Sequence, residues 1–129
     1  MRLLLDTHVI IGMIDRDNAR FAAPINWLAE QREALIHLRV ASLWEMSIKS
    51  RIGKLRLPID LQDLPKLATR LNIHILVITP DHVLTPLASE PMTRDPFDRL
   101  LLAQCTIEKL ELVTVDHALI AHPLAARFP

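Results

Sequence analysis

The sequence contains few of the residues that build glycine-rich loops, disulfides and aromatic clusters. Its two glycines, Gly12 and Gly53, are too few for a glycine-rich phosphate loop or a dinucleotide-binding fingerprint. The single cysteine, Cys105, excludes an internal disulfide and a cysteine metal cluster, and this usage fits a reducing cytoplasm. Three Phe, two Trp and no Tyr leave the core mostly to Leu, Ile, Val and Ala.

Long apolar runs are also missing. No run approaches the roughly 20 residues that span a bilayer. Asp6 and His8 interrupt the apolar start of the chain, which therefore does not read as a signal sequence. Half of the 129 residues are nevertheless hydrophobic, which predicts one folded domain over residues 1–129. We therefore expect a soluble cytoplasmic protein.

Neither sign of charge is in excess. Fifteen basic and fifteen acidic residues give a net charge of zero, which argues against nucleic-acid binding through bulk charge but leaves local patches open. Between Glu45 and Asp60 every charged residue is basic, namely Lys49, Arg51, Lys54 and Arg56. This run fits RNA phosphate contacts, and it fits equally well a solvated helix end, where cations are favoured.

Strand-like and helix-like segments alternate along the chain. Short apolar runs predict strands over residues 2–5, 35–40, 73–78 and 111–115. Helical spacing predicts helices over residues 8–14, 24–33, 42–52, 60–71, 80–88 and 96–109, and a helical turn over 116–120. Gly53 is the expected C-cap of the third helix, and Pro65 is expected to delay the regular start of the fourth. The alternation is typical of an α/β fold with a parallel sheet covered by helices.

Two aspartates follow directly on apolar strands near opposite ends of the chain. Asp6 comes after residues 3–5, and Asp116 comes after residues 112–115. Open α/β sheets bind ligands where their strands end, so the two carboxylates would share a pocket if their strands lie side by side. Each aspartate taken alone fits equally well the N-cap of the helical segment that follows it.

Further acidic residues stand at predicted helix starts. Glu45 lies three residues after Ser42, which fits a capping box with Ser42 as the N-cap. Asp95 precedes Pro96 and fits an N-cap before a first-turn proline. Capping explains Asp98 less fully, because one acid already serves this helix start. Asp95 and Asp98 would share one face of the helix.

Convergence of Asp6, Glu45, Asp98 and Asp116 would place four like charges in one crevice. Such a cluster must take up protons or bind a cation. Ligation by oxygen alone favours Mg²⁺ or Mn²⁺. An ion of this kind can generate a hydroxide nucleophile and neutralise the charge of a phosphodiester, with two ions as an option. Without a cation, the pocket would repel a polyanionic substrate.

At these positions the sequence resembles the PIN-domain ribonucleases, and specifically the VapC-like toxins of bacterial type II toxin–antitoxin pairs. The similarity lies in residues 4–8, 41–49, 53–55, 94–101 and 112–116, in the order expected of the family. The resemblance implies a three-layer α/β/α sandwich with a mostly parallel sheet, and Mg²⁺- or Mn²⁺-dependent hydrolysis of RNA. It further implies a homodimeric toxin that blocks translation and growth until its cognate antitoxin neutralises it.

The resemblance also assigns roles to individual residues. Its catalytic and metal-binding positions correspond to Asp6, Glu45, Asp98 and Asp116. Asp95 and Thr114 match supporting positions. Val115 departs from the pattern, because many relatives carry arginine there, and this puts one phosphate contact in question.

Several other side chains have more than one interpretation. Arg94 and Arg99 flank the acidic pair and fit either phosphate contacts or charge balance. His8 fits a hydrogen-bonding residue at a helix start better than a ligand. Trp27 and Trp44 are expected to pack in the core or at an interface rather than to stack on bases. Cys105 is expected to be a buried helix residue.

The acidic pattern has two alternative interpretations. A receiver-like signalling module needs an adjacent acidic pair after the first strand and a lysine after the last. Residues 6–8 and 116–117 provide neither. A catalytically silent PIN-like module that binds RNA or protein is the second alternative, and the intact set of carboxylates argues against it.

Overall fold

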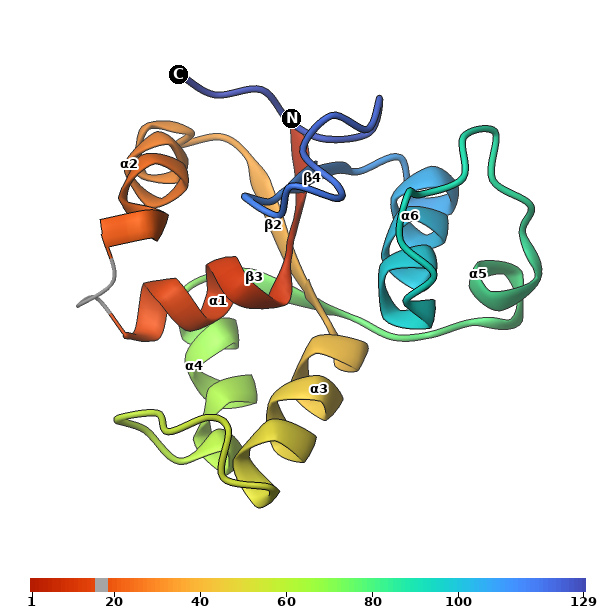
Figure 1. The fold of residues 1–129 in the computed structure, drawn as a ribbon. Coiled ribbons are helices and arrows are strands. Elements are labelled where there is room, and N and C mark those ends of the chain that lie inside the picture. The colour runs from red at the N-terminus through yellow and green to blue at the C-terminus, as the bar shows by residue number, and fades with distance from the viewer. Residues whose placement is uncertain (16–18) are drawn as a thin grey trace.

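The computed structural model describes residues 1–15 and 19–129, and a four-stranded parallel sheet lies at its centre (Figure 1). The strands are β1 (Arg2–Leu5), β2 (Leu35–Arg39), β3 (Ile73–Leu76) and β4 (Glu111–Val113). They lie in the order β3-β2-β1-β4, and each neighbouring pair is parallel. The strands that precede Asp6 and Asp116 are therefore neighbours, as the shared-pocket hypothesis requires.

Six helices and two short 3₁₀ turns connect these strands in the described residues. The helices are α1 (Thr7–Ile14), α2 (Ala22–Glu30), α3 (Val40–Arg51), α4 (Leu64–Arg70), α5 (Pro80–Leu84) and α6 (Pro96–Glu108). The 3₁₀ turns are η1 (Ala19–Phe21) and η2 (Leu61–Asp63). No helix in the described ranges is long and apolar enough to cross a bilayer.

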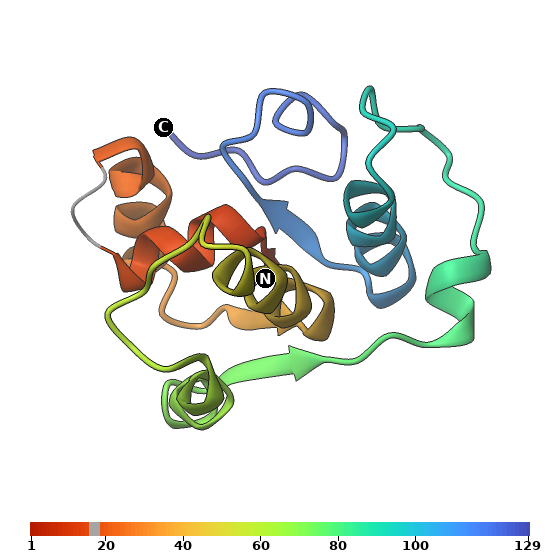
Figure 2. The ribbon, with the colours of Figure 1, turned by 60° about the horizontal axis from the view of Figure 1, so that its bottom comes forward.

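Strand β1 is buried on both faces, which defines the layers of the fold. Leu3 and Leu5 join a core cluster with residues of α1, α2, α3 and α4. Leu4, between them, points to the other face and packs against Leu101 and Leu102 of α6. Because successive side chains of a strand point to opposite faces, one apolar run supplies both cores. Figure 2 shows α1 and α6 on opposite sides of the sheet, and the expected three-layer α/β/α architecture is confirmed.

Two strands end two residues earlier than predicted, and β2 ends one residue earlier, at Arg39. The run 111–115 forms a strand only to Val113, because its neighbour β1 turns into α1 after Asp6. The run 73–78 forms a strand only to Leu76, which pairs with Arg39, the last residue of β2. In both cases the neighbouring main chain leaves the sheet, so the remaining apolar residues have no strand to pair with.

Several helix boundaries also differ from the prediction. Helix α3 begins at Val40, directly after β2, and not at Ser42. The segment 60–71 is divided into η2 and α4, because Pro65 is accommodated only in the first turn of an α-helix. Helix α2 spans 22–30 instead of 24–33, and α5 ends at Leu84 instead of residue 88. The turn after Asp116 is present, since the carbonyl of Asp116 accepts the N–H groups of Leu119 and Ile120.

Gly53 ends α3 as predicted. Its φ of +77° is a left-handed conformation that glycine adopts without the penalty of a Cβ. The N–H of Lys54 donates to the carbonyl of Lys49 at 2.9 Å, and the N–H of Gly53 donates to that of Ser50 at 3.2 Å. These two bonds form a Schellman motif, which turns the chain so that Lys54 follows the helix end closely.

Candidate functional site

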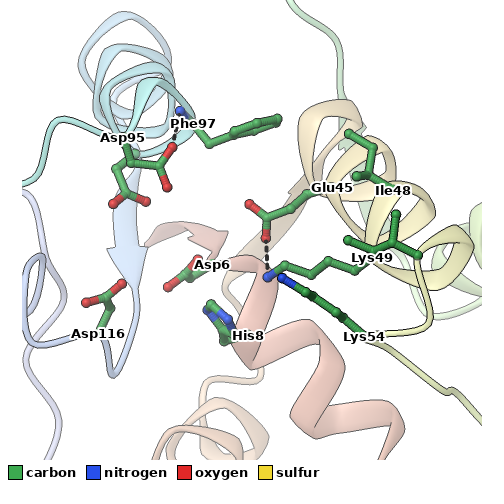
Figure 3. Close-up of a pocket in the computed structure, with 11 residues that line it drawn as sticks. Asp6, His8, Glu45, Ile48, Lys49, Lys54, Asp95, Phe97 and Asp116 are labelled. Carbon is green, nitrogen blue, oxygen red and sulfur yellow. Dashed lines mark hydrogen bonds and ion pairs between the residues drawn. The ribbon is translucent and has the colours of Figure 1, made fainter.

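A pocket of about 330 Å³ opens where β1, β2 and β4 end (Figure 3). Its lining consists of Asp6, His8, Glu45, Ile48, Lys49, Ile52, Lys54, Asp95, Phe97, Asp98 and Asp116. The four carboxylates singled out from the sequence and the supporting Asp95 thus line one pocket. In Figure 3, Asp6, Asp95 and Asp116 lie on one side, and Glu45, Lys49 and Lys54 reach in from α3 and the segment after it.

Asp6 occupies the N-cap position of α1, but its carboxylate makes no capping hydrogen bond. Instead its Oδ2 accepts a hydrogen bond of 2.7 Å from Thr114 Oγ1. Thr114 Oγ1 in turn accepts the N–H of Asp116 at 3.0 Å. One buried hydroxyl therefore connects the two strand-end aspartates. Burial raises the pKa of Asp6 above its ordinary value, and the hydrogen bond from Thr114 works in the opposite direction.

Asp116 both caps the turn that follows it and lines the pocket, which are the two roles that its sequence position left open. Its Oδ1 accepts the N–H of Ala118 at 2.9 Å, which caps the short turn that follows. The same carboxyl group lines the pocket. A strand-end aspartate in a tight turn is thus held in place by its own main chain.

The start of α6 supplies two carboxylates. Asp95 is the N-cap, as predicted, and its Oδ1 accepts the N–H of Phe97 at 2.9 Å. Asp98 lies in the first turn and is half-buried in the pocket. Burial, followed by the charges of Asp95, Asp6 and Asp116, raises the pKa of Asp98 to about 6. The carboxylates are close enough to oppose one another's ionisation.

Glu45 does not form the capping box that its position in the sequence also fits. The N-cap of α3 is Arg39, and Ser42 Oγ shares a buried 2.8 Å hydrogen bond with Thr7 Oγ1. Because the helix begins earlier, Glu45 lies in its second turn, where no main-chain N–H is free to cap. Its carboxylate faces the pocket and pairs with Lys49 at 3.4 Å.

The basic residues named from the sequence divide into two groups. Lys49 and Lys54 line the pocket. The lining does not include Arg51, Arg56, Arg94 or Arg99. Arg99 forms an exposed ion pair with Glu90 at 3.4 Å. RNA contacts by these four arginines stay a prediction.

Arg39 is a residue of this site that the sequence did not single out. It is the last residue of β2 and only 1% exposed, and its Nη1 donates to the carbonyl of Phe97 at 2.9 Å. Within the described residues its Nε has no hydrogen-bond partner. Burial lowers the pKa of Arg39, while Asp6, Glu45 and Asp98 act to raise it. From the sequence, the only indication of a role for Arg39 is that a charged residue ends an apolar strand. Its burial could not be predicted, because it depends on how α6 packs against the strand.

The two tryptophans have different environments. Trp27 is half-buried and contacts Phe128, with ring centroids 5.6 Å apart, so the packing prediction is confirmed. Trp44 contacts Phe97 at one side and is 57% exposed, so it does not pack in the core, and packing at an interface stays a prediction. His8 lines the pocket. Cys105 is buried as expected, and burial raises the pKa of its thiol to about 12, which keeps it protonated.

The charges of the site do not balance. Five carboxylates line the pocket, whereas Lys49, Lys54 and the buried Arg39 are the cations beside them in the described structure. In the same residues no three His, Cys, Asp or Glu side chains form a ready cluster for a metal ion. The oxygen donors and the excess negative charge fit a hard divalent cation in their chemistry.

Comparisons with known proteins place the chain in a family. The PIN domain family model matches residues 3–123, and the chain belongs to this family. A toxin–antitoxin complex from Klebsiella pneumoniae has a similar fold, with a TM-score of 0.63 and 15% identity over 97% of this chain and 96% of that chain. The crystal structure of VapBC2 from Rickettsia felis, bound to a DNA fragment from the promoter, is similar with a TM-score of 0.62 and 17% identity over the full length of both chains. No curated protein matches the sequence.

Proposed function

We propose that this protein is a VapC-like toxin, an endoribonuclease that uses Mg²⁺ or Mn²⁺ to hydrolyse RNA phosphodiester bonds. The observation that carries the proposal is the set of five carboxylates on one pocket of a PIN-domain chain. PIN domains are generally nucleases, and an excess of carboxylates without a cation would repel a phosphodiester. A divalent cation removes that difficulty.

In this proposal Asp6, Glu45, Asp98 and Asp116 hold the cation, and Asp95 supports them. All are oxygen donors on the pocket wall, which suits Mg²⁺ and Mn²⁺. Bound there, the ion would supply a nucleophilic hydroxide and neutralise charge on the phosphate. The raised pKa of Asp98 supports this assignment, because a nearby cation would relieve the repulsion that raises it.

The remaining polar residues would position the site and its substrate. Thr114 holds the carboxylate of Asp6 toward the pocket through its 2.7 Å hydrogen bond. Lys49 and Lys54 would bind phosphate oxygens, because both ammonium groups line the pocket. Arg39 would hold the first turn of α6, and with it Asp98, through the carbonyl of Phe97.

We further propose that a cognate antitoxin binds this protein, that the protein forms a homodimer and that it acts in the cytoplasm by blocking translation. The two solved structures described above are toxin–antitoxin complexes, which supports an antitoxin partner. If a small protein is encoded next to this gene, co-expression with it, followed by co-purification and size-exclusion chromatography, would test the partner and the stoichiometry.

The ribonuclease activity is tested with purified protein, RNA and Mg²⁺. Wild type should cleave RNA and lose activity in EDTA, and Asp6→Asn should reduce the rate at least 100-fold while keeping the fold. The fold should survive because the amide oxygen of asparagine can still accept the hydrogen bond from Thr114. Circular dichroism checks this point.

The matched control removes a carboxylate outside the pocket. Glu33 lies just before β2, at the opposite end of the strands from the pocket, and is exposed. Glu33→Gln should cleave RNA at the wild-type rate. Equal cleavage by wild type and Asp6→Asn would indicate a contaminating nuclease. Absence of both cleavage and Mg²⁺ binding would favour the catalytically silent module.

A further inference from the structure

We propose that His37 and His74 form a second metal site, outside the acidic pocket, which binds Zn²⁺ or Cu²⁺ through two imidazole groups. The two residues are direct partners in the parallel pairing of β2 with β3. Their ring centroids are 5.3 Å apart. Neither residue lines the acidic pocket, so the proposal does not depend on the ribonuclease function.

Both imidazoles lie on the face of the sheet that α6 covers in part. Leu4 of β1 packs against Leu101 and Leu102 on this face. Leu4 is the register partner of His37, and register partners point to the same face, so His37 and His74 lie there as well. Strand β3 is the edge strand of the described sheet on the side away from β4 (Figure 2). Because His37 is half-buried and His74 is exposed, an ion in solution can reach both rings.

The ring spacing fits one ion shared by the two side chains. Tetrahedral Zn²⁺ binds imidazole nitrogen at about 2.0–2.1 Å, which places the centroids of two bound imidazoles about 5 Å apart. The observed separation of 5.3 Å therefore needs no shift of either strand. Within the described residues no protein group bonds to the ring nitrogens of His74. Rotation about its Cβ–Cγ bond, which has a broad torsional minimum, can thus turn a nitrogen toward the ion.

His37 is prepared as a ligand by a hydrogen bond to the main chain. Its Nδ1 lies 3.1 Å from the carbonyl oxygen of Leu3. A carbonyl only accepts, so Nδ1 carries the proton and Nε2 of the neutral ring carries the lone pair. Metal-binding histidines are commonly held by such a bond, which fixes the ring and its tautomer. Burial lowers the pKa of His37, with Arg2 and His74 acting in the same direction, and this favours the neutral ring that a metal requires.

The donor atoms separate this site from the acidic pocket. Imidazole nitrogen suits Zn²⁺ and Cu²⁺, whereas carboxylate oxygen suits Mg²⁺ and Mn²⁺. Two imidazoles leave the remaining coordination positions to water, so we expect a Kd in the micromolar range, weaker than that of a site with four protein ligands. The charge of Arg2 opposes a cation beside His37. Its exposed guanidinium donates to the carbonyl of Glu108 at 3.3 Å, where solvent screens this repulsion.

Calorimetric titration with Zn²⁺ tests the site. The titration uses Asp6→Asn protein in excess Mg²⁺, because both conditions suppress Zn²⁺ binding in the acidic pocket. We expect one Zn²⁺ per chain, and His74→Ala in the same protein should weaken binding at least tenfold. The fold should survive this change, since His74 is exposed.

The matched control is His117→Ala in the Asp6→Asn protein. His117 is also an exposed histidine, but it lies outside the pocket lining and outside the paired strands. Its replacement should leave the Zn²⁺ affinity unchanged. Equal Zn²⁺ affinity with and without His74→Ala would overturn the proposal, and so would the absence of Zn²⁺ binding in the Asp6→Asn protein.

NMR spectra of the imidazole groups identify the ligands directly. Cu²⁺ is paramagnetic, and a substoichiometric amount broadens the signals of the rings that bind it. In the Asp6→Asn protein the signals of His37 and His74 should broaden first, whereas that of His117 should stay sharp. Selective broadening of His8 or His117 would place the ion elsewhere and overturn the proposal.

Thermal unfolding gives an independent readout. An ion that bridges β2 and β3 binds only the folded state and therefore raises Tm. In excess Mg²⁺, added Zn²⁺ should raise the Tm of the Asp6→Asn protein and leave that of the same protein with His74→Ala unchanged. An equal rise in both proteins would show that the stabilising ion is bound elsewhere, which contradicts the proposal.

Discussion

At the scale of single residues, Asp98 shows how the site affects stability. Burial and three neighbouring carboxylates raise its pKa to about 6 in the folded protein, compared with 3.8 for an ordinary aspartate. Between pH 4 and 6 the folded state therefore binds more protons than the unfolded state, and stability falls as the pH rises. Above pH 6 the full penalty of the ionised group is present.

We therefore predict that Asp98→Asn is more stable than wild type at pH 7 in EDTA. The gain should be about 1 kcal/mol, since solvent screens part of the interaction of this half-buried group. It should disappear near pH 3, below both pKa values, where the wild-type carboxyl is protonated in both states. Thermal unfolding of both proteins across this range measures it. A wild type that is the more stable protein at pH 7 would mean that the helix dipole outweighs the repulsion.

Thr114 connects the two strand-end aspartates through one hydroxyl group. Thr114→Val keeps the shape but removes the donor to Asp6 and the acceptor for the N–H of Asp116. We predict a loss of about 2 kcal/mol in the free energy of unfolding, because the hydrogen bond to Asp6 is buried. Urea unfolding measures the loss. Thr114→Ser keeps the hydroxyl and should lose about half as much or less. An equal loss in Thr114→Ser would show that the methyl group contributes as much as the hydroxyl, and a Thr114→Val variant as stable as wild type would contradict the prediction.

The sequence predicts the acidic side chains of the pocket better than their local roles. Asp6, Glu45, Asp98 and Asp116 could be named because strand ends and helix starts meet at one edge of an α/β sheet. The capping box of Glu45 could not be judged, because it depended on where β2 ends and α3 begins. The exposure of Trp44 could not be predicted for a related reason: it follows from the orientation of α3 relative to α6, which no local pattern specifies.

At the scale of elements, Arg39 connects the end of β2 to the start of α6. Its Nη1 binds the carbonyl of Phe97, one residue before Asp98, and its charge acts on Asp6, Glu45 and Asp98. Removal of one partner from a buried charged network usually costs about 3 kcal/mol or more. Arg39→Met should therefore lose about 3 kcal/mol of unfolding free energy at pH 7.

A double-mutant cycle shows how much of this loss is electrostatic. With Arg39 replaced, the repulsion on Asp98 grows, so Asp98→Asn should recover about 1 kcal/mol more than it gains in wild type. Urea unfolding of the four proteins in EDTA gives the coupling energy. Arg39→Met combined with Glu33→Gln is the control and should be additive. Additivity of Arg39→Met with Asp98→Asn as well would mean that Arg39 acts through packing and the Phe97 carbonyl alone.

Element types follow from the sequence more closely than element lengths. All four strands and all six described helices coincide with predicted segments. Their ends depend on partners that are distant in sequence. Val77 and Ile78 extend an apolar run, yet β3 stops at Leu76 because β2 stops at Arg39. The left-handed Gly53 directly after the C-cap Ile52 is a local feature, and this helix end could be predicted because φ > 0 requires no distant partner.

At the scale of the whole molecule, a neutral chain contains one strongly acidic pocket. Net charge did not reveal it, because the basic residues elsewhere balance the carboxylates. The strand order β3-β2-β1-β4 collects the pocket residues, since β1 has β2 on one side and β4 on the other. Residues more than a hundred positions apart thus share one pocket. From this arrangement we infer a cation site that the carboxylates at the strand ends and the helix starts share.

Calorimetric titration of Mn²⁺ into the metal-free protein tests this claim most directly. We predict that wild type and Glu33→Gln bind Mn²⁺ with the same affinity, and that Asp6→Asn and Asp98→Asn each weaken binding by tenfold or more. Mn²⁺ should also raise the Tm of wild type and not that of Asp6→Asn, because an ion that binds only the folded state stabilises it. Equal Mn²⁺ affinity in all four proteins would contradict the account.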